Sequence, residues 1–189
     1  MYITIAACGF QHEVWQKQYF PEDLPKEWYF DYYSNEHDAI LFSDIEQVSL
    51  GVDALSEMLS DVDDGFLFVF EGSENLKSLM LDAGLVNARL IFVSFPPELT
   101  SGRFLKIPFL NNSKVTLEQA IIIEQVNVSK TVCVLRVNSA LPINNEDIKY
   151  VLMHIHSNFG GYDQVCLFFG QRLQDIEVIN TAKIINDLL

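Results

Sequence analysis

The sequence is poor in cysteine and has no long apolar run. Its three cysteines, Cys8, Cys133 and Cys166, form no C-x-x-C pair and lie in apolar stretches, which predicts buried, reduced thiols. No apolar segment reaches the roughly 18 residues that a membrane helix requires. The first residues also lack the basic segment, apolar core and cleavage site of a secretory signal. We therefore expect a soluble cytoplasmic protein that does not bind membranes.

Basic residues are scarce as well. Lysine and arginine together number 12, against 26 acidic residues, and the formal net charge is −14. A protein that binds nucleic acid needs a basic surface to neutralise the phosphates. The scarcity of cations therefore argues against direct binding to nucleic acid or to anionic membranes. Repulsion between like-charged molecules keeps a protein soluble, and this effect is sufficient to explain the excess of acidic residues.

Motifs for cofactors and metals are missing too. No G-x-G-x-x-G follows the first predicted strand and no G-x-x-x-x-G-K-[ST] occurs, so nothing predicts a dinucleotide or P-loop site. His154 and His156 are two residues apart and point to different sides of a helix, unlike the i, i+4 pair of a helical zinc site. We predict neither a cofactor nor a metal site.

Apolar sequence is abundant: 49% of the 189 residues are hydrophobic, enough to build the core of a single domain over residues 1–189. Runs of β-branched and aromatic residues mark the strands. They are Tyr2–Cys8, Ala39–Ser43, Phe66–Phe70, Leu90–Phe95, Phe104–Ile107, Val132–Val137 and Val165–Phe169. Most are apolar throughout, as in parallel sheets that are covered on both faces.

Helical patterns occupy most of the intervals. The predicted helices are Pro25 to about Asn35, Leu50–Leu59, Glu74–Ala83, Leu117–Val126, Glu146 to about Asn158, and about Thr181 to Leu188. Pro25 suits a first helical turn, and Asn145 is the predicted cap of the fifth helix. The alternation of strands and helices predicts a parallel sheet, either a closed barrel or an open doubly wound sheet.

The most specific pattern lies in residues 1–44. Gly9-Phe10, Trp15, Tyr19-Phe20-Pro21, Pro25 and the segment Trp28–Tyr33 resemble the opening of the YecE-like family of uncharacterised TIM-barrel proteins (domain of unknown function 72). Gly65–Phe70, Leu90–Pro97 and Val134–Val137 resemble its third, fourth and seventh strands, in order. The resemblance implies an α/β fold of the TIM type, and it implies where a site lies but no reaction.

The chain is short for such a fold, because a complete (β/α)₈ barrel takes about 200 residues or more. Residues 97–131 leave too little sequence for two βα units. We therefore expect a barrel shortened to about seven strands. An open doubly wound parallel sheet is the alternative.

Departures from the family pattern fall at its polar positions. The resemblance implies His and Gly after the seventh strand, where this chain has Asn138 and Ser139. It implies an Asn pair after the eighth, where the chain has Gly170 and Gln171. The arginine of the seventh strand is the polar residue of the family pattern that is retained, and in this chain it is Arg136. Any activity of the family's shared pocket is therefore in question here.

Topology gives the best prediction of a site, because ligands of parallel α/β sheets bind at the C-terminal ends of the strands. The residues there are Cys8, Gly9, Phe10, Asp44, Glu71, Ser94, Arg136, Asn138 and Gln171. Arginine inside an apolar run is costly to bury without a partner. Arg136 is predicted either to bind a carboxylate or phosphate or to form a structural ion pair with Asp44 or Glu71. Gly9, Phe10, Asn138 and Gln171 would complete the ligand site.

Catalytic residues are harder to assign, and the sequence leaves open whether the protein is an enzyme. Asp44 and Glu71 are candidates for an acid–base pair, and solvent exposure is the alternative. Cys8 is a candidate nucleophile with His12 as its base. It lacks the sharp turn of a nucleophile elbow, so core packing is its alternative.

Aromatic residues gather in the first forty residues of the chain: Trp15, Tyr19, Phe20, Trp28, Tyr29, Phe30, Tyr32 and Tyr33. The periodic members at 28, 29, 32 and 33 predict one apolar helix face that packs on the sheet. The alternatives are a platform for a sugar or a base, or a surface that binds a protein partner.

Two hypotheses of function follow. The first is a YecE-like protein that binds a small anionic metabolite at the strand ends around Arg136. The second is a degenerate, non-catalytic member that acts through its surface, as a homo-oligomer or a partner-binding scaffold.

Overall fold

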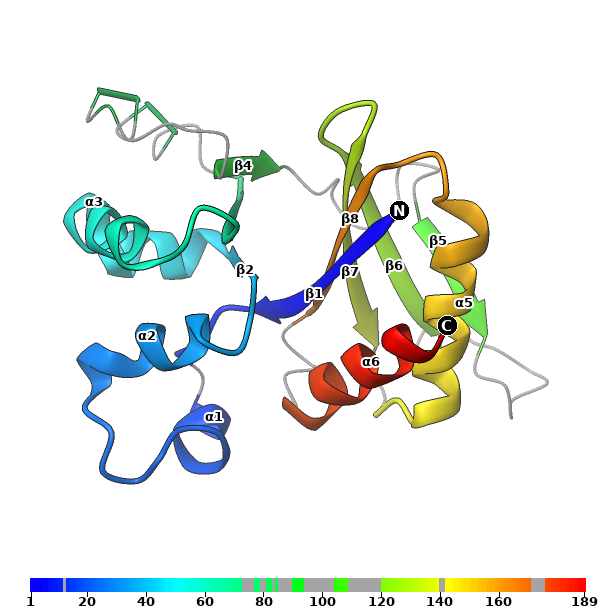
Figure 1. Ribbon diagram of the computed structural model, residues 1–189, viewed down its shortest axis with the longest axis horizontal. Helices are drawn as coiled ribbons and strands as arrows, with labels where there is room; N and C mark the ends of the chain where they lie inside the picture. The colour runs from blue at the N-terminus through cyan, green and yellow to red at the C-terminus, as the bar shows by residue number, and fades with distance from the viewer. Residues whose placement is uncertain are drawn as a thin grey trace. The chain divides into compact units, whose positions relative to one another are not determined.

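The computed structural model describes residues 1–11, 13–72, 77–78, 81–82, 84, 90–93, 104–108, 120–139, 142–170 and 176–189. Contacts divide the chain into two compact units. The C-terminal unit comprises Met1–Ala7 and Phe95–Leu189, and the N-terminal unit comprises Cys8–Ser94. Strands and helices of both units are drawn in Figure 1.

Five described strands form the sheet of the C-terminal unit. In spatial order they are β1 (Tyr2–Cys8), β8 (Gln164–Phe169), β7 (Val132–Ser139), β6 (Ala120–Asn127) and β5 (Phe104–Pro108). Strands β1, β8 and β7 are mutually parallel. Strand β6 runs antiparallel to both β7 and β5. The sheet is therefore mixed, and the expectation of a purely parallel sheet is wrong because β6 runs opposite to the other four strands of this unit.

The helix predicted over Leu117–Val126 is also wrong, because Ala120–Asn127 is strand β6. Three consecutive isoleucines, residues 121–123, favour a strand, since β-branched side chains lose rotamer freedom in a helix. A tight turn joins β6 to β7, with the amide of Val128 donating to the carbonyl of Val132 over 3.0 Å. The described residues thus form eight strands, one more than the seven expected.

Two helices, α5 (Asn145–Asn158) and α6 (Ile176–Leu188), complete this unit. Asn144, and not the predicted Asn145, caps α5. Its side chain accepts from the amides of Glu146 and Asp147, and the Asp147 carboxylate accepts from the Asn144 amide. This reciprocal pair is a capping box. The predicted apolar stripe of α5 is confirmed by four buried residues: Ile148, Val151, Leu152 and Ile155.

Helices α5 and α6 contact each other beside the sheet (Figure 1). His156 Nε2 lies 3.1 Å from Asn186 Oδ1 and joins the two helices. Helix α6 begins at Ile176 rather than near Thr181. No helix within the described residues is both long enough and apolar enough to cross a membrane.

The N-terminal unit has three parallel strands, β2 (Ala39–Phe42), β3 (Leu67–Glu71) and β4 (Leu90–Val93), paired in that order. Its helical segments are α1 (Glu13–Gln18), the 3₁₀ turn η1 (Lys26–Trp28), α2 (Tyr29–Ser34) and α3 (Asp44–Asp61). Helix α1 is not among the helices predicted from the sequence. The helix predicted over Leu50–Leu59 forms the second part of α3, beyond a kink at Gly51 with φ of 73°. Most of the helix predicted over Glu74–Ala83 lies outside the described residues.

Aromatic side chains form the core of the N-terminal unit, as the sequence predicts. Phe20 and Tyr29 stack with ring centroids 4.0 Å apart. Tyr33 is fully buried and donates its hydroxyl to the carbonyl of Ala39 over 2.7 Å. Trp15 stacks on Tyr33 with centroids 5.8 Å apart. Core packing is therefore confirmed for these residues.

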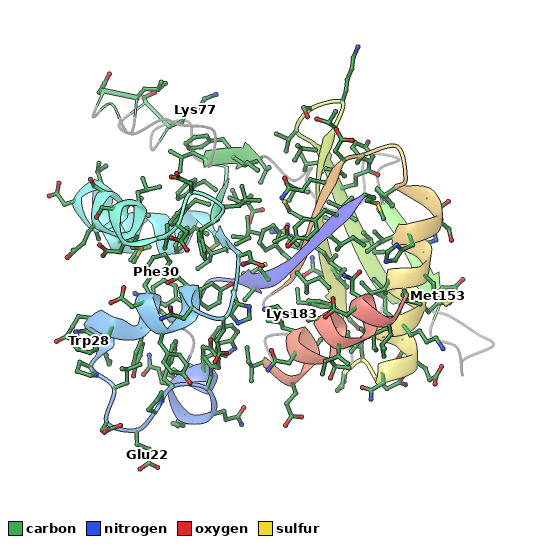
Figure 2. All side chains as sticks on the ribbon, viewed as in Figure 1. Glu22, Trp28, Phe30, Lys77, Met153 and Lys183 are labelled. Carbon is green, nitrogen blue, oxygen red and sulfur yellow. The ribbon has the colours of Figure 1, made fainter. Side chains whose placement is uncertain are left out.

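Trp28 is the exception, because 58% of its surface is exposed. It ends η1, directly before α2 begins. The tighter winding of a 3₁₀ turn changes the angular spacing of side chains, so Trp28 does not continue the apolar stripe of α2. Phe30 lies inside instead, while Trp28 points outward (Figure 2). The predicted apolar helix face is wrong at this position.

Candidate functional site

Strand β7 presents two different faces. Cys133, Leu135, Val137 and Ser139 alternate along one face and are all buried. The opposite face carries Arg136 and Asn138 near the C-terminal end of the strand, and both are half-buried. Side chains alternate between the two faces of a strand. The two predicted ligand residues of this strand therefore share one face.

The register places two residues beside Arg136. Phe168 is its partner on the parallel neighbour β8, and Glu124 is its partner on the antiparallel neighbour β6. Opposite charges at directly facing positions stabilise antiparallel pairs. The register therefore places Glu124 opposite Arg136 across β6 and β7. This position could not be predicted from a helix over residues 117–126, although the run of isoleucines was a signal for a strand.

Asn138 lies directly against Gly170, the residue that follows β8. A Cβ atom built on Gly170 would overlap Asn138 Oδ1 and stand 2.9 Å from its Cγ. The Gly170 amide donates to the carbonyl of Val137 over 2.8 Å, which ties its backbone to β7. A side chain at position 170 would therefore require the Asn138 side chain to shift. No local sequence pattern indicates this contact, because Asn138 lies on β7 and Gly170 follows β8.

Away from the C-terminal end of β7, the face that carries Arg136 and Asn138 becomes apolar. Val134 on β7 and Cys166 and Phe168 on β8 are fully buried. At the far end, Gln164 donates its side-chain amide to the Thr4 hydroxyl over 3.3 Å. Polar side chains therefore occupy both ends of the face, and the pair at the C-terminal end is the one that topology associates with ligands.

Several predicted site residues belong to the N-terminal unit. Gly9 adopts φ of 75° and donates its amide to the carbonyl of Leu41 over 2.8 Å. Phe10 is 2% exposed and packs on Phe30, with ring centroids 5.6 Å apart. Phe10 is thus part of the aromatic core, and its contact with a ligand stays a prediction. Cys8, at the end of β1, is buried and in no disulfide.

The acidic candidates lie in the same unit. Glu71 is the last residue of β3, and Asp44 is the first residue of α3. Their acid–base pairing and the ion pairs predicted with Arg136 stay predictions. His12, Ser94 and Gln171 lie outside the described residues. The structure therefore brings Arg136, Asn138 and Gly170 into one arrangement.

Burial suppresses the reactivity of two cysteines. It raises the pKa of Cys133 from 9.0 to about 12. Burial, with the nearby Cys133 as a second cause, raises the pKa of Cys166 to about 12 as well. Both thiols therefore stay protonated at neutral pH, and thiols are poor nucleophiles compared with thiolates. The prediction of buried, reduced cysteines is confirmed.

The histidines of α5 take part in local hydrogen bonds. Asn158 Nδ2 lies 3.2 Å from His154 Nδ1. Burial lowers the pKa of His154. In the part of the chain that the structure describes, no three His, Cys, Asp or Glu side chains are grouped to hold a metal ion.

Comparison of the structure with solved structures gives a match along nearly the whole chain. A DUF72 family protein from Thermotoga maritima MSB8, known from its crystal structure, superposes with a TM-score of 0.62. The alignment covers 97% of this chain and 99% of that one, at 10% sequence identity. The chain has the DUF72 fold. No protein-family model and no curated protein matches the sequence.

The DUF72 fold confirms the expected fold class, an α/β fold of the TIM type in shortened form. It also confirms, at the level of the fold, the resemblance found in the opening strand, the aromatic segment and the later strands. The shared fold carries no reaction with it, since one fold hosts many functions. The function must therefore be argued from Arg136, Asn138 and their surroundings.

Proposed function

We propose that this protein is a YecE-like protein that binds a small anionic metabolite at the C-terminal ends of β7 and β8, with Arg136 as its principal ligand. The observation that carries the proposal is the shared face of Arg136 and Asn138, both half-buried at one strand end. Strand ends of this kind are where α/β sheets hold their ligands.

The chemistry of this end suits an anion. A guanidinium offers five N–H donors in a planar fork and binds carboxylates or phosphates through two parallel hydrogen bonds. Partial burial strengthens such a bond, because the effective dielectric constant is lower than in water. The buried ring of Phe168 lies beside Arg136 in the register. It limits solvent access from that side.

Thermal unfolding in the presence of an anion panel tests the proposal. The panel contains acetate, lactate, succinate, phosphate and sulfate, at constant ionic strength. A ligand at 100 times its dissociation constant adds about 2.7 kcal/mol, or roughly 5–10 °C for a chain of this size. We expect this shift to vanish in Arg136→Ala. The matched control is Lys149→Ala, which removes an exposed cation from α5 and should keep the shift.

A second candidate function, binding of a protein partner or of another copy of this chain, is favoured by exposed apolar residues on α5 and α6. They are Tyr150, Met153, Ile184 and Leu188. Exposed apolar patches often mark interfaces. Sedimentation equilibrium over a range of concentrations tests it, with Ile184→Glu/Leu188→Glu as the comparison. A monomer at every concentration for both proteins would speak against self-association.

A further inference from the structure

We infer that two copies of this chain associate around a two-fold axis through the outer side of helices α5 and α6. The inference rests on the second candidate function, because it commits that candidate to one partner, a second copy. It is independent of anion binding at Arg136. The surface concerned, termed the helix-pair face, consists of four exposed apolar residues: Tyr150, Met153, Ile184 and Leu188.

Helix α6 carries apolar residues beyond its buried stripe. Ile176, Ile179 and Ala182 are buried. Ile184 and Leu188 are 63% and 81% exposed, and a spacing of four residues makes them neighbours on the helix surface. The solvent-facing side of a surface helix is normally charged or polar. Two large aliphatic side chains on that side of α6 therefore depart from the pattern of a helix that stays in water.

Helix α5 shows the same departure. Beyond its buried stripe, Tyr150 and Met153 are exposed, and a spacing of three residues places them next to each other on the helix surface. Met153 projects outward from α5 (Figure 2). Tyrosine and methionine are among the residue types that are enriched in protein–protein interfaces. Both helices therefore offer an apolar pair to a partner.

The two pairs belong to one layer of the C-terminal unit. Helices α5 and α6 pack against each other, and His156 Nε2 lies 3.1 Å from Asn186 Oδ1, which links them. Met153 lies about one turn before His156, and Asn186 lies between Ile184 and Leu188 in the sequence. The exposed apolar side chains therefore come from both helices, close to this link.

Charge is distributed unevenly between the two units. The N-terminal unit, residues 8–94, holds 17 acidic and 4 basic residues, a net charge of −13. The C-terminal unit holds 9 acidic and 8 basic residues, a net charge of −1. Glu146 and Lys149, one residue of each sign, are exposed on α5. The helix-pair face therefore belongs to the near-neutral unit.

This distribution favours a second copy as the partner. A cationic partner would be attracted to the N-terminal unit, and an anionic partner would be repelled by a chain with a net charge of −14. A second copy offers the same apolar, near-neutral surface, and a two-fold axis sets that surface against itself. Homodimer interfaces are more apolar than the rest of a protein surface. Contact between two N-terminal units would instead bring two charges of −13 together.

Sedimentation equilibrium of the full chain tests the inference. The wild type should form a dimer. Ile184→Glu/Leu188→Glu and Met153→Glu should each weaken it, the double variant by about 100-fold, because a buried carboxylate is costly and each substituted residue occurs twice in a two-fold interface. Trp28→Glu is the matched control, because Trp28 is an exposed apolar residue of the N-terminal unit. It should leave the dissociation constant of the dimer unchanged.

Two further measurements separate association from folding and from charge pairing. The melting temperatures of the variants, measured at dilutions that keep every protein monomeric, should match that of the wild type, because the substituted side chains are exposed. Raising the salt concentration from about 50 mM to about 500 mM should tighten the dimer, because salt screens the repulsion between two acidic chains. A dimer that salt weakens would be held by opposite charges, which would overturn the inference.

The outcomes also separate the inference from the candidate function on which it rests. A dimer that survives the substitutions on both helices, or one that Trp28→Glu disrupts, would overturn the inference and leave self-association standing. A monomer at every concentration of the wild type would overturn both. Anion binding at Arg136 is measured separately, by the thermal shift with the anion panel.

Discussion

The carboxamide of Asn138 occupies the space that a side chain on Gly170 would need. Asn138 and Gly170 each come directly after a residue of the last register pair of β7 and β8, which is Val137 and Phe169. A side chain introduced at Gly170 would therefore require the Asn138 side chain to shift.

The register that places Glu124 opposite Arg136 predicts a measurable coupling between the two charges. Glu124→Gln and Arg136→Gln, alone and together, form a double-mutant cycle in urea unfolding. We expect a coupling free energy of about 0.2–1 kcal/mol, as for charged cross-strand pairs in sheets. No coupling, together with full stability of Arg136→Gln, would contradict a structural ion pair between these two residues.

Removal of the Tyr33 hydroxyl should destabilise the protein. Tyr33→Phe keeps the ring in its stack and leaves the Ala39 carbonyl without the 2.7 Å hydrogen bond. An unsatisfied buried acceptor costs about 1–3 kcal/mol, measurable by urea unfolding. Tyr29→Phe is the matched control, because Tyr29 is also buried but stacks on Phe20 through its ring. Equal losses in both variants would contradict the role assigned to the Tyr33 hydroxyl.

The capping box of α5 predicts different effects at two neighbouring asparagines. Asn144→Ala removes the side chain that accepts from the amides of Glu146 and Asp147. It should lower the free energy of unfolding by about 1 kcal/mol. Asn145→Ala, at the first residue of the helix, should change it by less than about 0.5 kcal/mol. The reverse order would mean that the helix begins one residue later than described.

Alkaline pH should destabilise the protein through Cys133 and Cys166. Burial raises the pKa of each thiol from 9.0 in the unfolded chain to about 12 in the folded protein. The unfolded state therefore loses its thiol protons first, and stability that is fully present below pH 9 declines as the pH rises toward 12.

Unfolding free energies measured from about pH 8 to about pH 10 test this expectation. In Cys133→Ala/Cys166→Ala the decline over that interval should be shallower, although the variant begins from a lower stability. Buried thiols should also resist labelling by a disulfide reagent until the protein unfolds. Rapid labelling of Cys133 or Cys166 in the folded protein would contradict their burial.

Most strands of this fold can be predicted from the sequence, because they are buried on both faces and consist of apolar, often β-branched residues. Tyr2–Cys8 is predicted with the observed ends, and Ala39–Phe42 and Gln164–Phe169 differ by one residue at one end. Strand β6 is different. Its polar residues Glu124 and Gln125 give a helix-like spacing, and pairing with β5 and β7 decides its conformation. Such long-range pairing is invisible in a local pattern.

The candidate site, like the fold, can be predicted from the sequence only in part. The sequence places Arg136 and Asn138 near the end of a strand, and the structure confirms that location. The position of Glu124 opposite Arg136 can be predicted only when β6 is known to be a strand. The contact of Asn138 with Gly170 depends on the register of two strands separated by a helix. Both relationships arise from tertiary pairing, so no local pattern could have supplied them.

The pairing of β1 with β8 has a consequence for the synthesis of the chain. Thr4 and Gln164 lie side by side in the sheet although 160 residues separate them. At about 5–20 residues per second, the ribosome needs roughly 8–30 s to deliver the second partner after the first. During that interval an apolar strand that is buried in the native protein has no native neighbour on that side. The native pairing of the first strand with β8 can therefore form only after residues 164–169 have been synthesised.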